Sequence, residues 1–171
     1  MHTGDDTAFD WIWRDLDHLE AHRDEFLRPV DQILNELRPL AARERPQQIP
    51  AERVWLHADW KLATIVGTSG LHTVPPDGSQ SFWAYRRGRN VPSHLCLARR
   101  EPTRWVCLWG WWETGAFVIH TMYPGRIAPR EIHDPEIPLD ELPAAIEFWR
   151  NHAIVTEEGQ YSPGAPDRSA P

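Results

Sequence analysis

The first 45 residues carry apolar side chains at three- and four-residue steps, the spacing of a helix with one buried face. These positions are Phe9, Ile12, Trp13, Leu16 and Leu19, followed by Phe26, Val30, Ile33, Leu37 and Leu40. Pro29 interrupts the series, and a proline lacks a backbone donor and restricts the residue before it. The pattern therefore predicts a pair of helices within residues 1–45, with a break after Leu27.

After Pro50 the pattern changes to short runs of β-branched and aromatic residues separated by turn signals, which is typical of strands. We predict strands near Arg53–His57, Leu62–Val66, Ser81–Arg86, Ser93–Arg99, Arg104–Trp112 and Ala116–Tyr123. Glu113-Thr114-Gly115 is short enough to join the last two strands as a hairpin. Adjacent hairpins predict an antiparallel sheet of about five to six strands.

A short helix is predicted at about Leu139–Ala153, and residues 157–171 offer so little apolar surface that we expect a disordered tail. Helices, then antiparallel strands, then one closing helix are typical of an α+β domain whose sheet packs one face on helices. We therefore predict a single α+β domain over residues 1–156. Function is expected on the opposite face of its sheet.

The composition of the 171-residue chain, 41% hydrophobic and 25% charged, is that of a folded protein. Its apolar stretches are shorter than a membrane span and its N-terminus lacks a secretory signal, so we expect a cytoplasmic protein without a membrane partner. Two cysteines are too few for a disulfide framework or a zinc cluster. Because no histidine pair has compact metal-ligand spacing either, we predict neither a metal nor another cofactor.

Arginines concentrate between residues 86 and 130, although the net charge of the chain is −7. That segment holds eight arginines and two acidic residues, a local charge of +6. Such a segment could focus RNA or another anionic ligand on one face, or its arginines could be ordinary solubilising residues. In the first interpretation Arg86 or Arg89 would neutralise a reacting phosphate, and Arg87 and Arg89 would bind the substrate.

Histidines in the strand region are candidates for proton transfer, because imidazole titrates near neutral pH. They are His57, His72, His94 and His120. Ser69 lies in a glycine-flanked loop that could present its hydroxyl and backbone N–H groups to an anion, or could be a simple turn.

The most specific segment is Phe117-Val118-Ile119-His120-Thr121-Met122-Tyr123-Pro124-Gly125. An apolar strand leading into Thr-x-Tyr-Pro resembles the last core strand of bacterial ribonuclease toxin domains of the barnase, EndoU, colicin and RelE-like superfamily. Elsewhere the resemblance covers only the order of helices before an antiparallel sheet. It implies metal-independent RNA cleavage by attack of the ribose 2′-OH on the adjacent phosphate, and a cognate antitoxin or immunity protein as partner.

On this resemblance Thr121 and Tyr123 match the family's strand hydroxyls, and His120 lies beside them. His72 or His120 would take the 2′-OH proton, and a second histidine or Tyr123 would protonate the leaving oxygen. The His-x-x-x-His element of several contact-dependent toxins is missing, so the general base stays open. In a regular strand His120 and Thr121 point to opposite faces, and both can line one site only if a bulge intervenes.

Two other functions fit the same sequence. Trp83, Trp105, Trp109 and Trp111 all have odd numbers and could line one wall of an apolar pocket, as in a small-molecule binding protein or enzyme. In the ribonuclease interpretation, Trp83 would instead stack on an unpaired base. The third alternative is an antitoxin or immunity protein whose acidic helices meet a basic partner.

Overall fold

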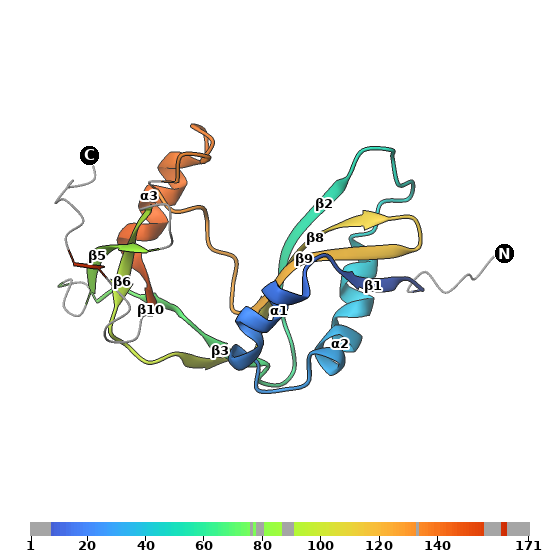
Figure 1. Cartoon of the computed structure of the whole chain (residues 1–171), viewed down its shortest axis with the longest axis horizontal. Helices are drawn as coiled ribbons and strands as arrows, with labels where there is room; N and C mark the ends of the chain where they lie inside the picture. The colour runs from blue at the N-terminus through green and yellow to red at the C-terminus, as the bar shows by residue number, and fades with distance from the viewer. Residues whose placement is uncertain are drawn as a thin grey trace. The chain divides into compact units, whose positions relative to one another are not determined.

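A computed structural model describes residues 8–75, 77, 81–86, 91–132, 134–155 and 162–163 (Figure 1). Its helices and sheets form two compact units. The first unit comprises Met1–Ser69 and Pro102–Ile127, and the second comprises Gly70–Glu101 and Ala128–Pro171. The α+β class is confirmed, whereas folding of residues 1–156 as a single domain stays a prediction.

The first unit is built on a four-stranded sheet with the order β1-β9-β8-β2. Strands β2, β8 and β9 are antiparallel neighbours, and β1 pairs in parallel with β9. A separate two-stranded sheet pairs β3 with β7. The bounds of these strands are β1 Asp10–Trp13, β2 Val54–Lys61, β3 Gly67–Ser69, β7 Glu101–Thr103, β8 Trp105–Glu113 and β9 Ala116–Pro124.

The predicted hairpin between β8 and β9 is confirmed, and Gly115 turns the chain with a φ of 77° that favours glycine. The register of this hairpin shifts once along its length. Trp109 lies opposite Thr121, whereas the next residue, Gly110, lies opposite Ile119. His120 is therefore the extra residue of a β-bulge in β9.

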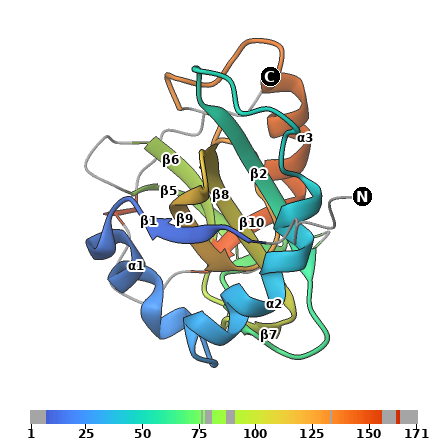
Figure 2. The same ribbon diagram turned by 90° about the vertical axis from the view of Figure 1, so that its right-hand side faces the viewer.

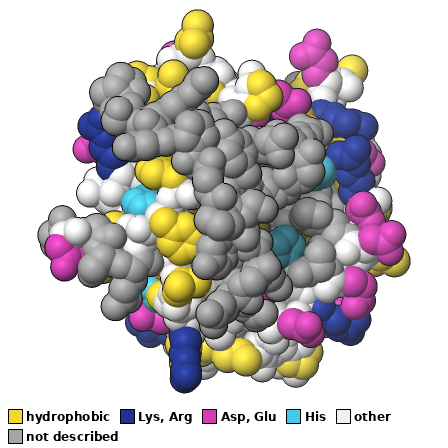
Figure 3. Space-filling view, turned by 60° about the vertical axis from the view of Figure 1, so that its left-hand side comes forward, with side chains coloured by type: hydrophobic (Ala, Val, Ile, Leu, Met, Phe, Trp, Pro, Cys, Tyr) yellow, Lys and Arg dark blue, Asp and Glu magenta, His cyan; other side chains and the backbone are white. Residues whose placement is uncertain are grey.

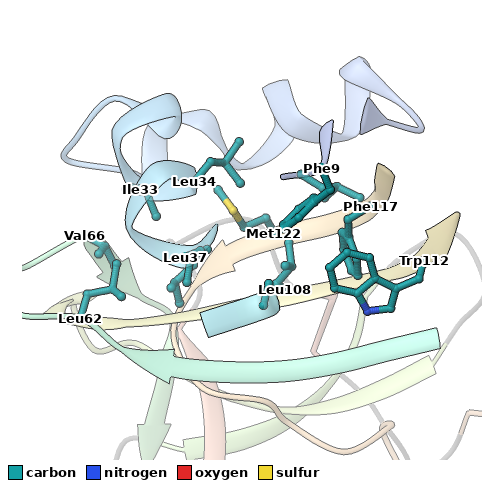
Figure 4. Close-up of a cluster of buried hydrophobic side chains, with 13 residues drawn as sticks. Phe9, Ile33, Leu34, Leu37, Leu62, Val66, Leu108, Trp112, Phe117 and Met122 are labelled. Carbon is teal, nitrogen blue, oxygen red and sulfur yellow. The ribbon is translucent and has the colours of Figure 1, made fainter. Parts of the chain in front are cut away.

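Helix α2, Val30–Arg43, covers one face of the four-stranded sheet (Figure 2). Its buried positions recur at three- and four-residue steps, as the sequence pattern predicted for this part of the chain. They meet the inward side chains of the strands in one hydrophobic core (Figure 4), whose members include Ile33, Leu34, Leu37, Leu108, Trp112, Phe117 and Met122.

The first half of the N-terminal segment differs from the predicted helix pair. Before α2 the chain forms strand β1, the two-turn helix α1 (Leu16–His22) and a 3-10 turn at Arg23–Glu25. Phe9, Trp11 and Trp13 alternate into the core along β1, a period-two pattern that the three- and four-residue steps concealed. The free edge of β9 supplies hydrogen bonds that an isolated segment lacks, so pairing decides in favour of a strand.

The predicted strand at Leu62–Val66 is also wrong, because these residues form an irregular loop. Leu62 and Val66 are buried, and the three residues between them are exposed. Two anchors four residues apart do not alternate as a strand face does. The loop is held instead by the N–H groups of both anchors, which donate to Arg104 and Thr103 carbonyls at 2.8 and 2.9 Å.

The second unit contains a five-stranded sheet with the order β11-β5-β6-β10-β4. Helix α3, Leu142–Asn151, confirms the predicted closing helix and lies beside β6 and β10 (Figure 1). The prediction of one antiparallel sheet of five to six strands is wrong, because the strands of the two units form separate sheets. The strands here are β4 Leu71–Thr73, β5 Ser81–Arg86, β6 Val91–Cys96, β10 His152–Val155 and β11 Ser162–Pro163.

The predicted disordered tail, residues 157–171, lies outside the described residues except for β11, which pairs with β5. Within the described part of the chain, every helix is too short or too polar to cross a membrane.

Candidate functional site

The face of the four-stranded sheet opposite α2 carries aromatic and polar side chains on three adjacent strands. Strand alternation places them there, because the intervening residues of each strand point into the core. We call this surface the tryptophan–histidine face. Its members are Trp55, His57 and Asp59 of β2, Cys107, Trp109 and Trp111 of β8, and His120, Thr121 and Tyr123 of β9.

Trp109 is the centre of this face. The imidazole of His57 lies 5.5 Å from the Trp109 ring, and that of His120 lies 4.6 Å away in an edge-on contact, both between ring centroids. Trp55 lies 5.6 Å from the same indole and 4.9 Å from that of Trp111. Two histidines and three tryptophans therefore form one contiguous cluster within the first unit.

The β-bulge decides which β9 side chains reach this cluster. Thr121 is the register partner of Trp109, and His120 also contacts the Trp109 ring. In an unbroken strand these two adjacent residues would point to opposite faces. The extra residue lets His120 and Thr121 lie on the same face. This is the bulge that the sequence required if both residues are to line one site.

Arg14, which follows β1, reaches His120 from the neighbouring strand. Its Nη1 lies 3.1 Å from Nδ1 of the imidazole. A guanidinium has donors and no acceptor, so this contact is a hydrogen bond only when Nδ1 carries no proton. In the tautomer with its proton on Nε2, His120 accepts this hydrogen bond from Arg14.

Burial lowers the pKa of His57 below its ordinary value of 6.5, and the nearby carboxylate of Asp59 opposes that shift. One edge of His57 is exposed, while its ring packs on Trp109. Desolvation disfavours the imidazolium form, so His57 is neutral at neutral pH and able to accept a proton.

Asp59 is held by the chain that follows β9. Its Oδ2 accepts a hydrogen bond from the Ile127 N–H at 2.9 Å and lies 3.4 Å from Nε of Arg126. The Arg126 guanidinium also lies 4.5 Å from the ring centroid of Trp105. These contacts hold in place the Asp59 carboxylate, whose charge opposes the effect of burial on the pKa of His57.

Cys107 is a thiol rather than a nucleophile. Burial raises its pKa to about 12, although a side-chain hydrogen bond with Tyr123 acts in the opposite direction. A thiol with so high a pKa holds almost no thiolate at neutral pH, and the thiolate is the reactive form. On this face the Tyr123 hydroxyl is therefore paired with an unreactive thiol.

The structure divides the predicted catalytic and substrate-binding residues. His120, Thr121 and Tyr123 share the tryptophan–histidine face. His72 in β4 and Arg86 in β5 belong to the second unit, so their joint action with His120 stays a prediction. The remaining predicted residues are Ser69, which ends β3 in the first unit, Trp83 in β5, and Arg87 and Arg89, which lie outside the described residues.

The predicted wall of four tryptophans is only partly correct. Trp109 and Trp111 do share a face of β8, but Trp83 lies in the second unit, where it stacks on His94 with 4.7 Å between ring centroids. Odd-numbered residues share a face only within one regular strand, and Trp83 belongs to a strand of a different sheet. Trp55, on the neighbouring strand β2, completes the aromatic cluster instead.

The arginines of the predicted basic segment are divided between the two units, so a shared basic face stays a prediction. Two of them face acidic partners: Arg126 lies near Asp59, and Arg130 lies 3.4 Å from Glu136. In the space-filling view, basic and acidic side chains lie next to each other (Figure 3). Besides Arg126, the candidate site meets the positive charges of Arg14 and Arg53, which lie outside that segment.

Sequence reasoning overlooked Arg14, Trp55 and Asp59 of the candidate site, and named His57 only as one of four candidate histidines. A signal for Trp55, His57 and Asp59 was present, because these residues alternate with apolar residues along β2. Arg14 carried no such signal. Its place depends on the parallel pairing of β1 with β9.

Among the described residues, no group of three or more His, Cys, Asp or Glu side chains is arranged to hold a metal ion. The chemistry available at the tryptophan–histidine face is therefore that of imidazoles, hydroxyls, a guanidinium and aromatic rings.

No protein-family model and no curated protein matches this sequence. A crystal structure of a conserved hypothetical protein from Toxoplasma gondii ME49 is similar, with a TM-score of 0.58 and 12% sequence identity. The match covers 89% of this chain and 96% of the Toxoplasma chain. At this identity the similarity concerns the fold alone.

Proposed function

We propose that the tryptophan–histidine face cleaves RNA without a metal, as the toxin-like β9 strand suggests. The observation that carries this proposal is the pair of imidazoles, His57 and His120, on either side of Trp109. Two proton-transfer groups beside an aromatic surface and a guanidinium are what 2′-OH attack on a phosphate requires.

In the proposed reaction the neutral His57 accepts the proton of the ribose 2′-OH while O2′ bonds to phosphorus. The bond between phosphorus and O5′ then breaks, and O5′ takes a proton from His120. The products are a 2′,3′-cyclic phosphate and a 5′-hydroxyl, so no water or metal enters this step. Thr121 and Tyr123, which lie on the same face, would bind the phosphate oxygens.

Arg14 links substrate binding to the proton on His120. Without substrate its guanidinium donates to Nδ1 of His120, which keeps that nitrogen unprotonated. A substrate phosphate would attract the guanidinium, because charge-assisted hydrogen bonds to phosphate are stronger than one to a neutral ring. Nδ1 could then take up the proton that makes His120 an acid.

The test is cleavage of a single-stranded RNA in excess EDTA by the full chain. We expect His57→Ala and His120→Ala each to lower the rate by about 10²–10⁴, the usual contribution of an acid or base. His152→Ala is the matched control, since this histidine stacks on Phe148 in the second unit. Melting temperatures of all variants separate lost chemistry from lost folding.

Retained cleavage in both histidine variants would overturn the assignment of the two roles. If the wild-type chain cuts no RNA, the ribonuclease proposal fails and the Trp-lined small-molecule site becomes the better interpretation. A ribonuclease of this toxin type would also need a cognate antitoxin or immunity protein. Protection of host cells by a neighbouring gene product tests that partner.

A further inference from the structure

Trp55 combines exposure with a fixed position. It is 46% exposed, whereas Trp111, its register partner on β8, is only 4% exposed. Trp55 contacts the rings of Trp109 and Trp111, and His120 lies 6.1 Å away in an edge-on arrangement. The indole is therefore held by three rings on one side while much of its surface meets solvent.

Trp111, the base of this support, is itself held in place. Its Nε1 donates a hydrogen bond to Glu113 Oε1 at 2.8 Å. The Arg53 guanidinium lies 4.5 Å from its ring centroid, and the guanidinium of Arg14 lies at 5.9 Å. Two cations thus contact the ring of Trp111, the register partner of the exposed Trp55.

Strand geometry aligns these groups with the proposed catalytic histidine. Arg53, Trp55 and His57 are alternate residues on one side of the chain, spaced by about 6.8 Å per pair of residues in an extended strand. A bound chain with alternating rings and negative charges would match this order. Its base would meet Trp55, and a phosphate would meet Arg53.

Building on the proposed ribonuclease function, we propose that Trp55 stacks on an unpaired base and restricts the site to single-stranded RNA. Every base has a π-face, so an aromatic platform binds single strands with little sequence preference. In a duplex the bases are already stacked on one another and are unavailable to the indole. The preorganised ring loses little freedom on binding, which favours affinity.

The experiment measures binding rather than cleavage, by fluorescence anisotropy of a labelled single-stranded 2′-deoxyoligonucleotide. This probe lacks the 2′-OH and cannot be cut, so the result does not depend on the catalytic proposal. We expect tighter binding of the single strand than of a duplex of the same sequence. Trp55→Ala should weaken single-strand binding by roughly 5- to 100-fold, the usual effect of losing one base stack.

Three further variants sharpen the measurement. Trp55→Phe retains an aromatic face and should recover most of the affinity, whereas a merely structural role would not distinguish phenylalanine from leucine at this position. Phe148→Ala removes a ring from the second unit and should leave binding unchanged. Arg53→Gln should weaken binding at low salt more than at high salt, because its contribution is electrostatic.

Equal affinity of wild type and Trp55→Ala, or equal affinity for single strand and duplex, would overturn the stacking proposal. Binding of a neutral oligosaccharide in place of the oligonucleotide would overturn it too. If the wild type binds single strands through Trp55 but cuts no RNA, the catalytic proposal fails and the stacking site stands. If cleavage at limiting RNA is insensitive to Trp55→Ala, the stacking site fails and the catalytic proposal stands.

Discussion

The two faces of the four-stranded sheet are made by the same strands but have different chemistry. On the core face, Trp112, Phe117 and Leu108 pack against α2 with 1% or less of their surface exposed. On the tryptophan–histidine face, aromatic rings alternate with histidine, aspartate and arginine contacts. Aromatic content alone therefore does not distinguish a core from a candidate site.

The polar partners of the tryptophans make the distinction. The buried indole N–H of Trp112, and that of Trp11 beside the core, have no hydrogen-bond partner among the described residues. The N–H of Trp111, on the opposite face, donates to Glu113. The core tolerates an unpaired group for the sake of packing, whereas the other face places its rings by directed contacts. Directed contacts are what a binding surface needs.

The largest expected effect tests this contrast between faces. Phe117→Ala should lower the free energy of unfolding by about 3–5 kcal/mol, because it leaves a cavity beneath α2. Trp55→Ala, on the other face, should cost less, about 1–2 kcal/mol, since a half-exposed ring buries less area. Urea unfolding of both variants measures the difference, and similar losses would show that both faces are structural.

Predictability from the sequence also differed between the faces. The strand pattern located β5, β8 and β9 and the turn between β8 and β9, because alternation and glycine signals are local. The candidate site depended on two non-local features, the pairing of β1 with β9 and the bulge at His120. Neither feature can be recognised within a short window of sequence. The contact between Arg14 and His120 could therefore not be predicted from it.

The segment before α2 shows the same limit of local patterns. Phe9, Ile12 and Trp13 fit a helical period, while Phe9, Trp11 and Trp13 fit a strand period equally well. Four residues are too few to separate the two periods. The segment forms a strand because the edge of β9 is available for pairing. Such an edge is a property of the folded sheet and cannot be read from the segment itself.

The second expected effect concerns Gly110, which lies opposite the bulge. A Cβ at this position would sit 2.2 Å from the Val118 carbonyl oxygen and 2.6 Å from the Phe117 ring. Gly110→Ala should therefore cost about 1–3 kcal/mol through overpacking. It should also shift the NMR signals of His120 more than those of His57, because the strand that must move carries His120. Unchanged stability would contradict this account of the bulge.

A smaller effect is expected at Asp59. Asp59→Ala removes the acceptor of the Ile127 N–H and should cost about 1 kcal/mol in thermal or urea unfolding. Arg126→Gln keeps that acceptor and removes only a partner that is itself 62% exposed, so it should cost less. If the arginine variant were the more damaging one, the ion pair rather than the backbone hydrogen bond would hold the loop.

The smallest effect should come from the titration of His57. Its pKa is lowered in the folded protein, so the unfolded chain binds more protons than the folded one as the pH falls below 6.5. His57 therefore contributes stability above pH 6.5 that is lost on acidification. As the pH falls from about 7.5 to 5, the unfolding free energy of the wild type should decrease relative to that of His57→Gln. An increase instead would mean that the attraction to Asp59 exceeds the effect of burial, and His57 would then be charged where the proposed reaction needs a base.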